Sequence, residues 1–181
     1  MSRFRKVLVP LDFSACASDV AANAADVAEA FGAQAVLLHV VELPSGVSSS
    51  TMIEPKPGED PVEAGAHMRS GAQERLTRFA PFFEAKGVNV SMHLQSGAIA
   101  EAILEGAREV GADLIVMGTH GRQGLSRLML GSVAEGVMRH ATCPVMTVRT
   151  LHRAACESAN CNWCDSAVTE EARDVEAEQM G

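Results

Sequence analysis

Short apolar runs recur through the first 150 residues of the chain, and segments with helical periodicity separate them. Three of these runs are continuous, at residues 6–9, 35–41 and 114–117. A continuous run is typical of a strand that is buried on both faces in the middle of a parallel sheet. Two more runs, at 88–94 and 144–149, alternate apolar and polar residues and therefore predict edge strands with one face in water.

Between the strands, apolar residues recur at spacings of three and four, which places them on one face of a helix. Gly32 and Gly111 follow two of the predicted helices and should end them. Pro81 should interrupt the second helix near Ala80, because proline has no backbone N–H to donate. The residues predicted to face inward are Val20, Ala24, Val27 and Phe31 in the first helix, Met68, Ala72, Leu76, Phe79 and Phe83 in the second, and Ile99, Ile103, Ala107 and Val110 in the third.

Residues 43–61 lie between the second strand and the second helix and are rich in proline, serine and glycine. This composition predicts a long, mobile loop. Two roles for the loop stay open at this point, a lid over a ligand and a plain excursion over the surface.

The alternation of strands and helices predicts the α/β class, with a parallel sheet, right-handed crossovers and helices on both faces. With the continuous runs in the centre and the alternating runs at the edges, the prediction is a doubly wound, five-stranded parallel sheet. Numbered along the chain, the strand order is 3-2-1-4-5, which reverses between the first and the fourth strand. Ligands bind outside the carboxyl ends of the strands at such a reversal. Asp12 and Gly118 follow these two strands and should face each other there.

The strand at 114–117 leads through a glycine-rich loop into a helix that Gly131 and Ser132 open. Glycine lets the backbone approach a ligand closely, and the free N–H groups at a helix start favour an anion. We therefore predict a phosphate site at Gly118, Gly121, Gly131 and Ser132. The spacing G-x2-G-x9-G-S matches neither the P-loop nor the dinucleotide fingerprint. The alternative is a glycine loop that only turns the chain.

A second candidate cluster follows the first strand, where the sequence is Pro10-Leu11-Asp12-Phe13-Ser14. A carboxylate and a hydroxyl just past the end of a strand lie where ligands bind in open α/β sheets. On position alone, capping of the next helix by Asp12 and Ser14 is an equal alternative. His39, inside the run 35–41, is expected to be a hydrogen-bonded core residue rather than a ligand.

Three motifs extend this picture. Met117-Gly118-Thr119-His120-Gly121 has the form M-G-[ST]-H-G, the segment 140–145 has the form H-x-x-C-P-V, and Pro10, Asp12 and Ser14 have the form P-x-D-x-S. Together with G-x2-G-x9-G-S, they resemble the universal stress protein family, in its ATP-binding branch. The resemblance covers residues 3–149 in order.

The resemblance implies the strand order given above and ATP, with Mg²⁺ or Mn²⁺, in the crevice between Asp12 and Gly118. It implies that backbone groups of Val40 and Val41 bind adenine. Arg122 and Arg127 are candidates for added phosphate charge, and His120 for a residue that structures the loop or lies beside the ribose. The nucleotide-binding residues predicted in this way are Pro10, Leu11, Asp12, Ser14, Val40, Val41, Met117, Gly118, His120, Gly121, Arg122, Gly131, Ser132 and Val133.

The resemblance also implies a homodimer in which the edge strand 144–149 pairs antiparallel with its twin. Exposed apolar edges tend to be covered or paired, so shielding of this edge by residues 151–181 is the alternative.

Composition narrows the choice of partners. The net charge of −8 argues against a nucleic-acid partner. No run approaches the ~20 apolar residues of a membrane span, and the first apolar stretch breaks at Pro10, which argues against a signal peptide. Five cysteines without an export signal indicate the reducing cytoplasm.

The resemblance ends near Arg149, so the chain divides into a nucleotide-binding domain at 1–150 and a C-terminal extension at 151–181. The extension holds 7 acidic and 2 basic residues, against 16 and 13 in the first 150 residues. Three cysteines and a histidine in it have the ligand set of a structural zinc site: His152, Cys156, Cys161 and Cys164. A redox pair at Cys161 and Cys164, or free thiols on a disordered tail, are the alternatives.

The favoured function is a cytoplasmic, nucleotide-dependent regulatory or stress-response dimer that binds ATP. The glycine motif contains no lysine, and no base is evident that would activate water, so fast ATP hydrolysis is not expected. Two alternatives come from other classes of protein. One is an enzyme that slowly hydrolyses or transfers nucleotides at the α-phosphate, and the other is a zinc- or redox-responsive module that works through the C-terminal cysteines.

Overall fold

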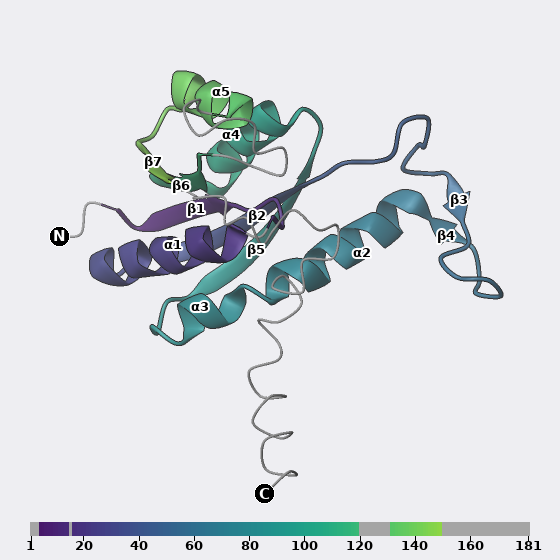
Figure 1. The fold of residues 1–181 in the computed structure, drawn as a ribbon, viewed down its shortest axis with the longest axis horizontal. Helices are drawn as coiled ribbons and strands as arrows, with labels where there is room; N and C mark the ends of the chain where they lie inside the picture. The colour runs from purple at the N-terminus through teal and green to yellow at the C-terminus, as the bar shows by residue number, and fades with distance from the viewer. Residues whose placement is uncertain (1–3, 15, 120–130, 150–181) are drawn as a thin grey trace, which may run out of the picture.

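The computed structural model describes residues 4–14, 16–119 and 131–149. Its centre is a parallel sheet of five strands in the order β5-β2-β1-β6-β7 (Figure 1). The strands are β1 (Lys6–Pro10), β2 (Gln34–Val41), β5 (Val90–Ser96), β6 (Leu114–Gly118) and β7 (Val145–Val148). This is the predicted order 3-2-1-4-5, and the predicted central and edge strands are confirmed.

Helices cover both faces of the sheet, as the alternating pattern predicted. They are α1 (Ala17–Phe31), α2 (Ala64–Thr77), α3 (Ala80–Glu84), α4 (Ile99–Val110) and α5 (Ser132–His140). Figure 1 shows α1, α2 and α3 on one face and α4 and α5 on the other. None of the helices in the described part of the chain is long and apolar enough to cross a membrane.

The period of two in a strand sends alternate side chains into two separate cores. From β1, Val7 and Val9 enter the core beneath α1, α2 and α3, while Leu8 enters the core beneath α4 and α5. These three side chains are fully buried, as is Ile115 of β6. The continuous apolar runs are therefore explained by strands that have a helix layer on each face.

The predicted helix ends are largely confirmed. Gly32 and Gly111 end α1 and α4 in the left-handed conformation, with φ of 58° and 65°, and their N–H groups bond to carbonyls of the last turn. α2 ends at Thr77, and Pro81 lies in the first turn of α3, where its missing N–H leaves no intrahelical bond unmade.

Some details of the sequence prediction are wrong. α1 begins at Ala17 with Cys16 as its N-cap, so Ser14 is not the capping residue. The edge strand predicted at 88–94 is β5 (Val90–Ser96), which begins and ends two residues later than the alternation suggested. Phe31 and Met68 were expected to face inward but are 37% and 36% exposed, because each lies near the end of its helix beyond the sheet's cover.

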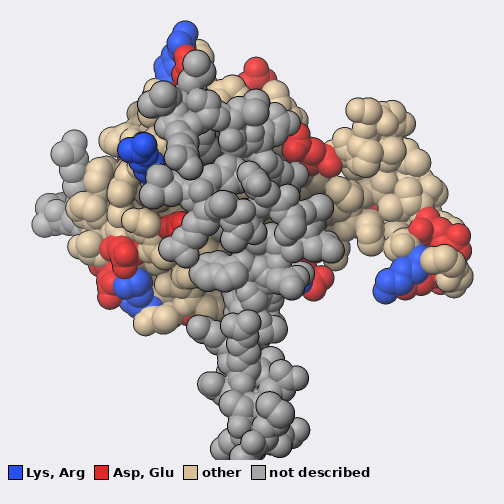
Figure 2. All heavy atoms as spheres, viewed as in Figure 1, with Lys and Arg blue, Asp and Glu red and all other residues tan. Residues whose placement is uncertain are grey.

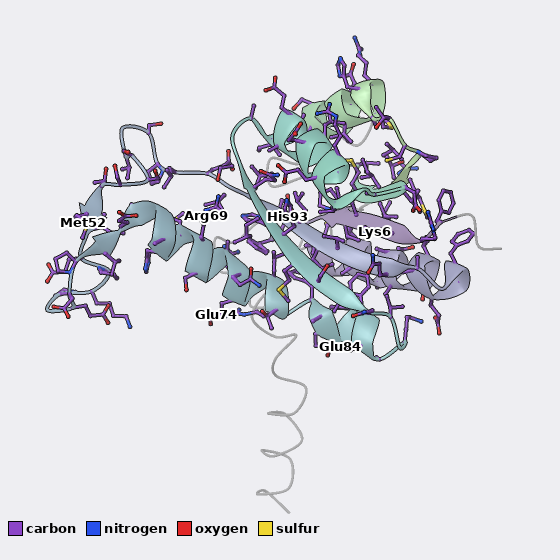
Figure 3. The ribbon with its side chains drawn as sticks, turned by 180° about the vertical axis from the view of Figure 1, so that it is seen from behind. Lys6, Met52, Arg69, Glu74, Glu84 and His93 are labelled. Carbon is purple, nitrogen blue, oxygen red and sulfur yellow. The ribbon has the colours of Figure 1, made fainter. Side chains whose placement is uncertain are left out.

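The predicted loop at 43–61 contains one short strand that the sequence analysis did not predict. β3 (Met52–Ile53) pairs antiparallel with β4 (Val62–Glu63), and this two-stranded arm projects from the start of α2 (Figure 1). Acidic and basic side chains lie together on the arm in Figure 2, and Met52, labelled in Figure 3, is 58% exposed. The arm could not be predicted from the sequence, because strands of two residues are too short to show a periodic pattern.

The pairing of β1 with β6 fixes the two strands at the reversal. The Asp113 carboxylate, just before β6, accepts the backbone N–H groups of Arg5 and Lys6 at 2.9 and 3.0 Å. The Lys6 ammonium in turn donates to the carbonyl of Val110 at the end of α4, at 2.7 Å. These contacts join the starts of the two strands and so set the level at which their opposite ends meet.

Candidate functional site

The carboxyl ends of β1 and β6 meet at the same edge of the sheet. The two strands are parallel neighbours, with Val7 opposite Leu114 and Leu8 opposite Ile115. Continued along this register, Pro10 and Met117 lie at one level, and the connections that carry Asp12 and Gly118 leave the sheet side by side. The predicted reversal of strand order thus brings together two segments that are more than 100 residues apart in the sequence.

Backbone hydrogen bonds hold the start of α5 at this edge. The Thr119 N–H donates to the carbonyl of Val148 at 3.0 Å, and the Gly131 N–H donates to the carbonyl of Thr119 at 2.9 Å. Gly131 is the N-cap of α5 and directly precedes Ser132. The two motif glycines, Gly118 and Gly131, are therefore brought close together, and the positive end of the α5 dipole lies at the carboxyl end of β6.

Gly131 has the backbone conformation of an ordinary N-cap residue. Its φ of −62° and ψ of 144° lie in the extended region that any residue adopts. Its dihedral angles therefore do not require glycine, and glycine is among the residues favoured at an N-cap. The first N–H groups of α5 have no partner within the helix itself, which suits an anion.

The connection after β1 orients a carboxylate at the same edge. Asp12 is half-buried, and its Oδ1 accepts the backbone N–H of Ser14 at 3.0 Å. Leu11 is bonded to β2 on both sides: its N–H donates to the carbonyl of Leu38 at 2.8 Å, and its carbonyl accepts Nδ1–H of His39 at 2.7 Å. The Asp12 carboxylate is therefore oriented by the backbone N–H of Ser14.

Phe13 has an unusual backbone conformation. Its φ is +59°, and within the described chain the other residues with positive φ are glycines. For a bulky residue this conformation costs about 1–3 kcal/mol and persists only where the surroundings enforce it. The Phe13 ring is stacked on His39, with centroids 4.0 Å apart, and the Arg75 guanidinium lies 4.2 Å from the ring centroid. These contacts of β2 and α2 enforce the strained turn next to Asp12.

The sequence did not mark Phe13, His39 and Arg75 as site residues. His39 was predicted to be a hydrogen-bonded core residue; its bond to Leu11 confirms the hydrogen bond, whereas the residue is only half-buried. The sequence pattern gave no sign of the second contact of His39, the stacking of its ring on Phe13. A positive φ at a phenylalanine leaves no signal in composition or periodicity, so only the fold could disclose this group.

The end of β2 offers its backbone rather than its side chains. Val40 and Val41 are 7% and 6% exposed, and their side chains enter the two different cores. A ligand above this strand end would be recognised by main-chain groups. The same holds for Met117, whose side chain is 5% exposed, whereas Ser132 at the start of α5 is exposed and Val133 is half-buried.

Several predicted residues lie outside the described residues. These are His120, Gly121, Arg122 and Arg127 of the glycine loop, and His152, Cys156, Cys161 and Cys164 of the C-terminal extension. Among residues 4–14, 16–119 and 131–149, no group of three His, Cys, Asp or Glu side chains could hold a metal ion. In the same part of the chain, burial raises the pKa of the half-buried Cys143 thiol.

The geometry agrees with what comparison with known proteins finds. The model of the universal stress protein family matches residues 3–149. The chain is 34% identical to universal stress protein MJ0531 of Methanocaldococcus jannaschii over 147 residues, which cover 81% of this chain and 82% of the relative. The chain belongs to the universal stress protein family. The resemblance of the motifs to this family is thereby confirmed.

Solved structures of universal stress proteins have the same architecture. One from Burkholderia pseudomallei is 32% identical with a TM-score of 0.59, over 82% of this chain and 98% of that one. Another, solved in complex with cAMP, is 24% identical with a TM-score of 0.62, over 83% of this chain and 100% of that one. The α/β fold of this universal stress protein is thus the fold of its family.

Proposed function

We propose that this universal stress protein binds ATP, together with Mg²⁺ or Mn²⁺, in the crevice between the β1–α1 and β6–α5 connections. The observation that carries the proposal is the bond from Gly131 N–H to the Thr119 carbonyl at 2.9 Å. This bond brings the N-terminus of α5 beside the end of β6, and the register of β1 with β6 puts Asp12 at the same edge of the sheet. The choice of an adenine nucleotide as the first ligand to test is supported by a structurally similar universal stress protein that was solved in complex with cAMP.

Each part of the nucleotide has a matching part of the crevice in this proposal. N–H groups of the first turn of α5, from Ser132 onward, hold phosphates, with the hydroxyl of Ser132 as a further donor. The backbone at Val40 and Val41 binds adenine, and Asp12 accepts hydrogen bonds from the ribose. From the loop, we propose that Gly121 and Arg122 add phosphate contacts and that His120 either structures the loop or contacts the ribose.

The donor set also fits a divalent cation with the nucleotide. Mg²⁺ and Mn²⁺ take oxygen ligands, and they are commonly held by substrate phosphates with one or two protein oxygens. The hydroxyls of Ser14 and Ser132 are the candidates for those protein oxygens. The cation would neutralise phosphate charge, which matters in a chain with a net charge of −8.

We infer a regulatory role rather than fast catalysis. The binding motif has no lysine to stabilise a transferring phosphoryl group. Nucleotide occupancy would instead bias the contacts of a cytoplasmic homodimer. The edge of β7 supports pairing with a second copy, because this strand lies at the end of the sheet and exposes 39% of Met146.

The test is calorimetric titration of ATP, ADP and adenosine into the wild-type chain and two variants. Gly131→Val places a side chain where phosphates approach, and we expect ATP affinity to fall by about 100-fold. Ser132→Ala removes one hydroxyl donor, and we expect a fall of about 3–10-fold. Adenosine affinity should change little in either variant. Unchanged ATP affinity in both folded variants would refute the phosphate site.

A second candidate function concerns the C-terminal extension. We propose that His152, Cys156, Cys161 and Cys164 bind Zn²⁺, because three thiolates and one imidazole within 13 positions form a tetrahedral ligand set. Zinc analysis of the full chain and of a chain ending at residue 150 tests this. We expect about one Zn²⁺ per full chain and none in the shorter one. A full chain that contains no zinc and whose cysteine thiols remain reactive would favour one of the alternatives, a redox pair or free thiols.

A further inference from the structure

We infer that His39 is a positioning residue for the crevice, which holds Asp12 in place against the ribose of the nucleotide. The inference rests on the proposed function, since it takes a nucleoside to be the ligand at Asp12. His39 lies in β2, the neighbour of β1, and its ring reaches both residues that flank Asp12.

The first contact fixes the residue before Asp12. His39 Nδ1 lies 2.7 Å from the Leu11 carbonyl oxygen. A carbonyl only accepts, so Nδ1 carries the proton and donates it. The Leu11 N–H is bonded to the Leu38 carbonyl at 2.8 Å, so both backbone groups of Leu11 are held by two consecutive residues of β2.

The second contact fixes the residue after Asp12. The Phe13 ring is stacked on the imidazole with 4.0 Å between centroids and 29° between planes. Phe13 is 8% exposed and keeps a left-handed φ of +59°. That conformation needs a standing side-chain contact, because a bulky residue otherwise leaves it. Arg75 of α2, over the same ring at 4.2 Å, adds a second restraint from another element.

Asp12 is thus held between two residues that one imidazole restrains. Its Oδ1 is already oriented by the Ser14 N–H at 3.0 Å. A carboxylate fixed in this way accepts hydrogen bonds from ribose hydroxyls without first losing freedom, which is the advantage of preorganisation. Release of either flanking residue should therefore weaken the ribose contact more than the phosphate contacts, which lie on the β6–α5 connection.

Two variants distinguish the effect of the hydrogen bond to Leu11 from the effect of the stacking on Phe13. His39→Phe keeps a ring that stacks on Phe13 but cannot donate to Leu11. His39→Asn keeps an N–H near the position of Nδ1 but has no ring. The matched control is His93→Phe on β5, labelled in Figure 3, whose imidazole pairs with Glu109 at 3.0 Å. Asp12→Ala is the reference for complete loss of the ribose contact.

Two readouts are taken on each full-length variant. The first is the ratio of the dissociation constants of 2′,3′-dideoxy-ATP and ATP, measured by calorimetry. The second is the hydrogen-exchange rate of the Ser14 amide, which reports its bond to Asp12 and needs no ligand. A loss of global stability alone would not change the ratio of two ligands.

We expect the wild type to prefer ATP over the dideoxy analogue by about tenfold, and Asp12→Ala to abolish the preference. Both His39 variants should lower it to about threefold or less and speed exchange at Ser14, while His93→Phe changes neither. The inference is overturned if both His39 variants match the wild type in both readouts, or if Asp12→Ala keeps the preference.

Failure of the proposed function has a different outcome. A wild-type chain that binds neither ATP nor its analogue removes the nucleotide from the proposal. The Ser14 amide then decides the positioning role by itself: faster exchange in the His39 variants supports it, and unchanged exchange rejects it.

Discussion

The two connections that border the proposed nucleotide crevice are held in different ways. The β1–α1 connection carries Asp12 and depends on side chains from other elements, namely His39 of β2 and Arg75 of α2. The β6–α5 connection depends at its described ends on backbone bonds, from Thr119 to Val148 and from Gly131 to Thr119. One side of the crevice is therefore shaped by specific packing and the other by main-chain geometry.

The difference corresponds to the parts of a nucleotide that each side would meet. A phosphate needs several N–H donors and space, which any helix start with glycine supplies. A ribose needs one acceptor at a defined position, which requires rigid support around the residue that bears it. Substitutions should therefore affect stability on the first connection and affinity without much loss of stability on the second.

The largest expected effect is on Phe13. Phe13→Ala removes a buried ring and leaves alanine in the left-handed region, so we expect the free energy of unfolding to fall by about 3–5 kcal/mol. Phe13→Gly loses the same ring but relieves the backbone, and should be about 1 kcal/mol more stable than the alanine variant. Urea unfolding of both variants measures the two values. Glycine no better than alanine would show that the positive φ is not retained in solution.

Gly131→Val is the matched change on the other connection, with a smaller expected effect on stability. Its φ of −62° accommodates valine, so the free energy of unfolding should fall by only about 1 kcal/mol, the usual cost of a poor N-cap residue. The same urea experiment applies. A loss as large as that of Phe13→Ala would remove the contrast between the two connections.

The smallest effect is expected at a turn that backbone bonds already close and that carries a cluster of charges at the surface. Lys86, after α3, pairs with Asp26 and Glu29 of α1 at 2.8 and 2.9 Å, and these two hydrogen-bonded carboxylates raise the pKa of Lys86 above its ordinary value. Lys86→Met should lower the melting temperature only slightly, because water and salt screen such pairs.

The sign of the pH dependence follows from the raised pKa of Lys86. A raised folded-state pKa gives a contribution that is present below the unfolded value of 10.5 and is lost as the pH rises through the folded-state value. The difference in melting temperature between wild type and Lys86→Met should thus be constant from about pH 6 to 9 and shrink in high salt. Thermal unfolding across that range checks this. A difference that persists in about 1 M salt would contradict a purely electrostatic role.

Much of this could be predicted before the fold was known. The continuous runs around Leu8 and Ile115 predicted the central strands, because a strand with a helix layer on each face has no polar side. Gly32, Gly111 and Pro81 marked helix ends through backbone restrictions that belong to the residue itself. The strand order followed from central and edge patterns, and it placed Asp12 and Gly118 at one edge.

The arm at β3 and β4 and the exposure of Phe31 and Met68 were not predictable in this way. Two-residue strands have no period, and the end of a helical stripe does not tell where the sheet beneath it stops.

The sequence by itself determined the family, the class of fold and the candidate glycines, since these depend on residue type and spacing along the chain. Only the tertiary structure decided how the crevice is held. The contacts among His39, Phe13 and Arg75 join three elements, and the bond between Gly131 and Thr119 closes a gap of 12 positions. Such contacts depend on which elements become neighbours, and a one-dimensional pattern carries the periodicity of each element but not the side chains it will meet.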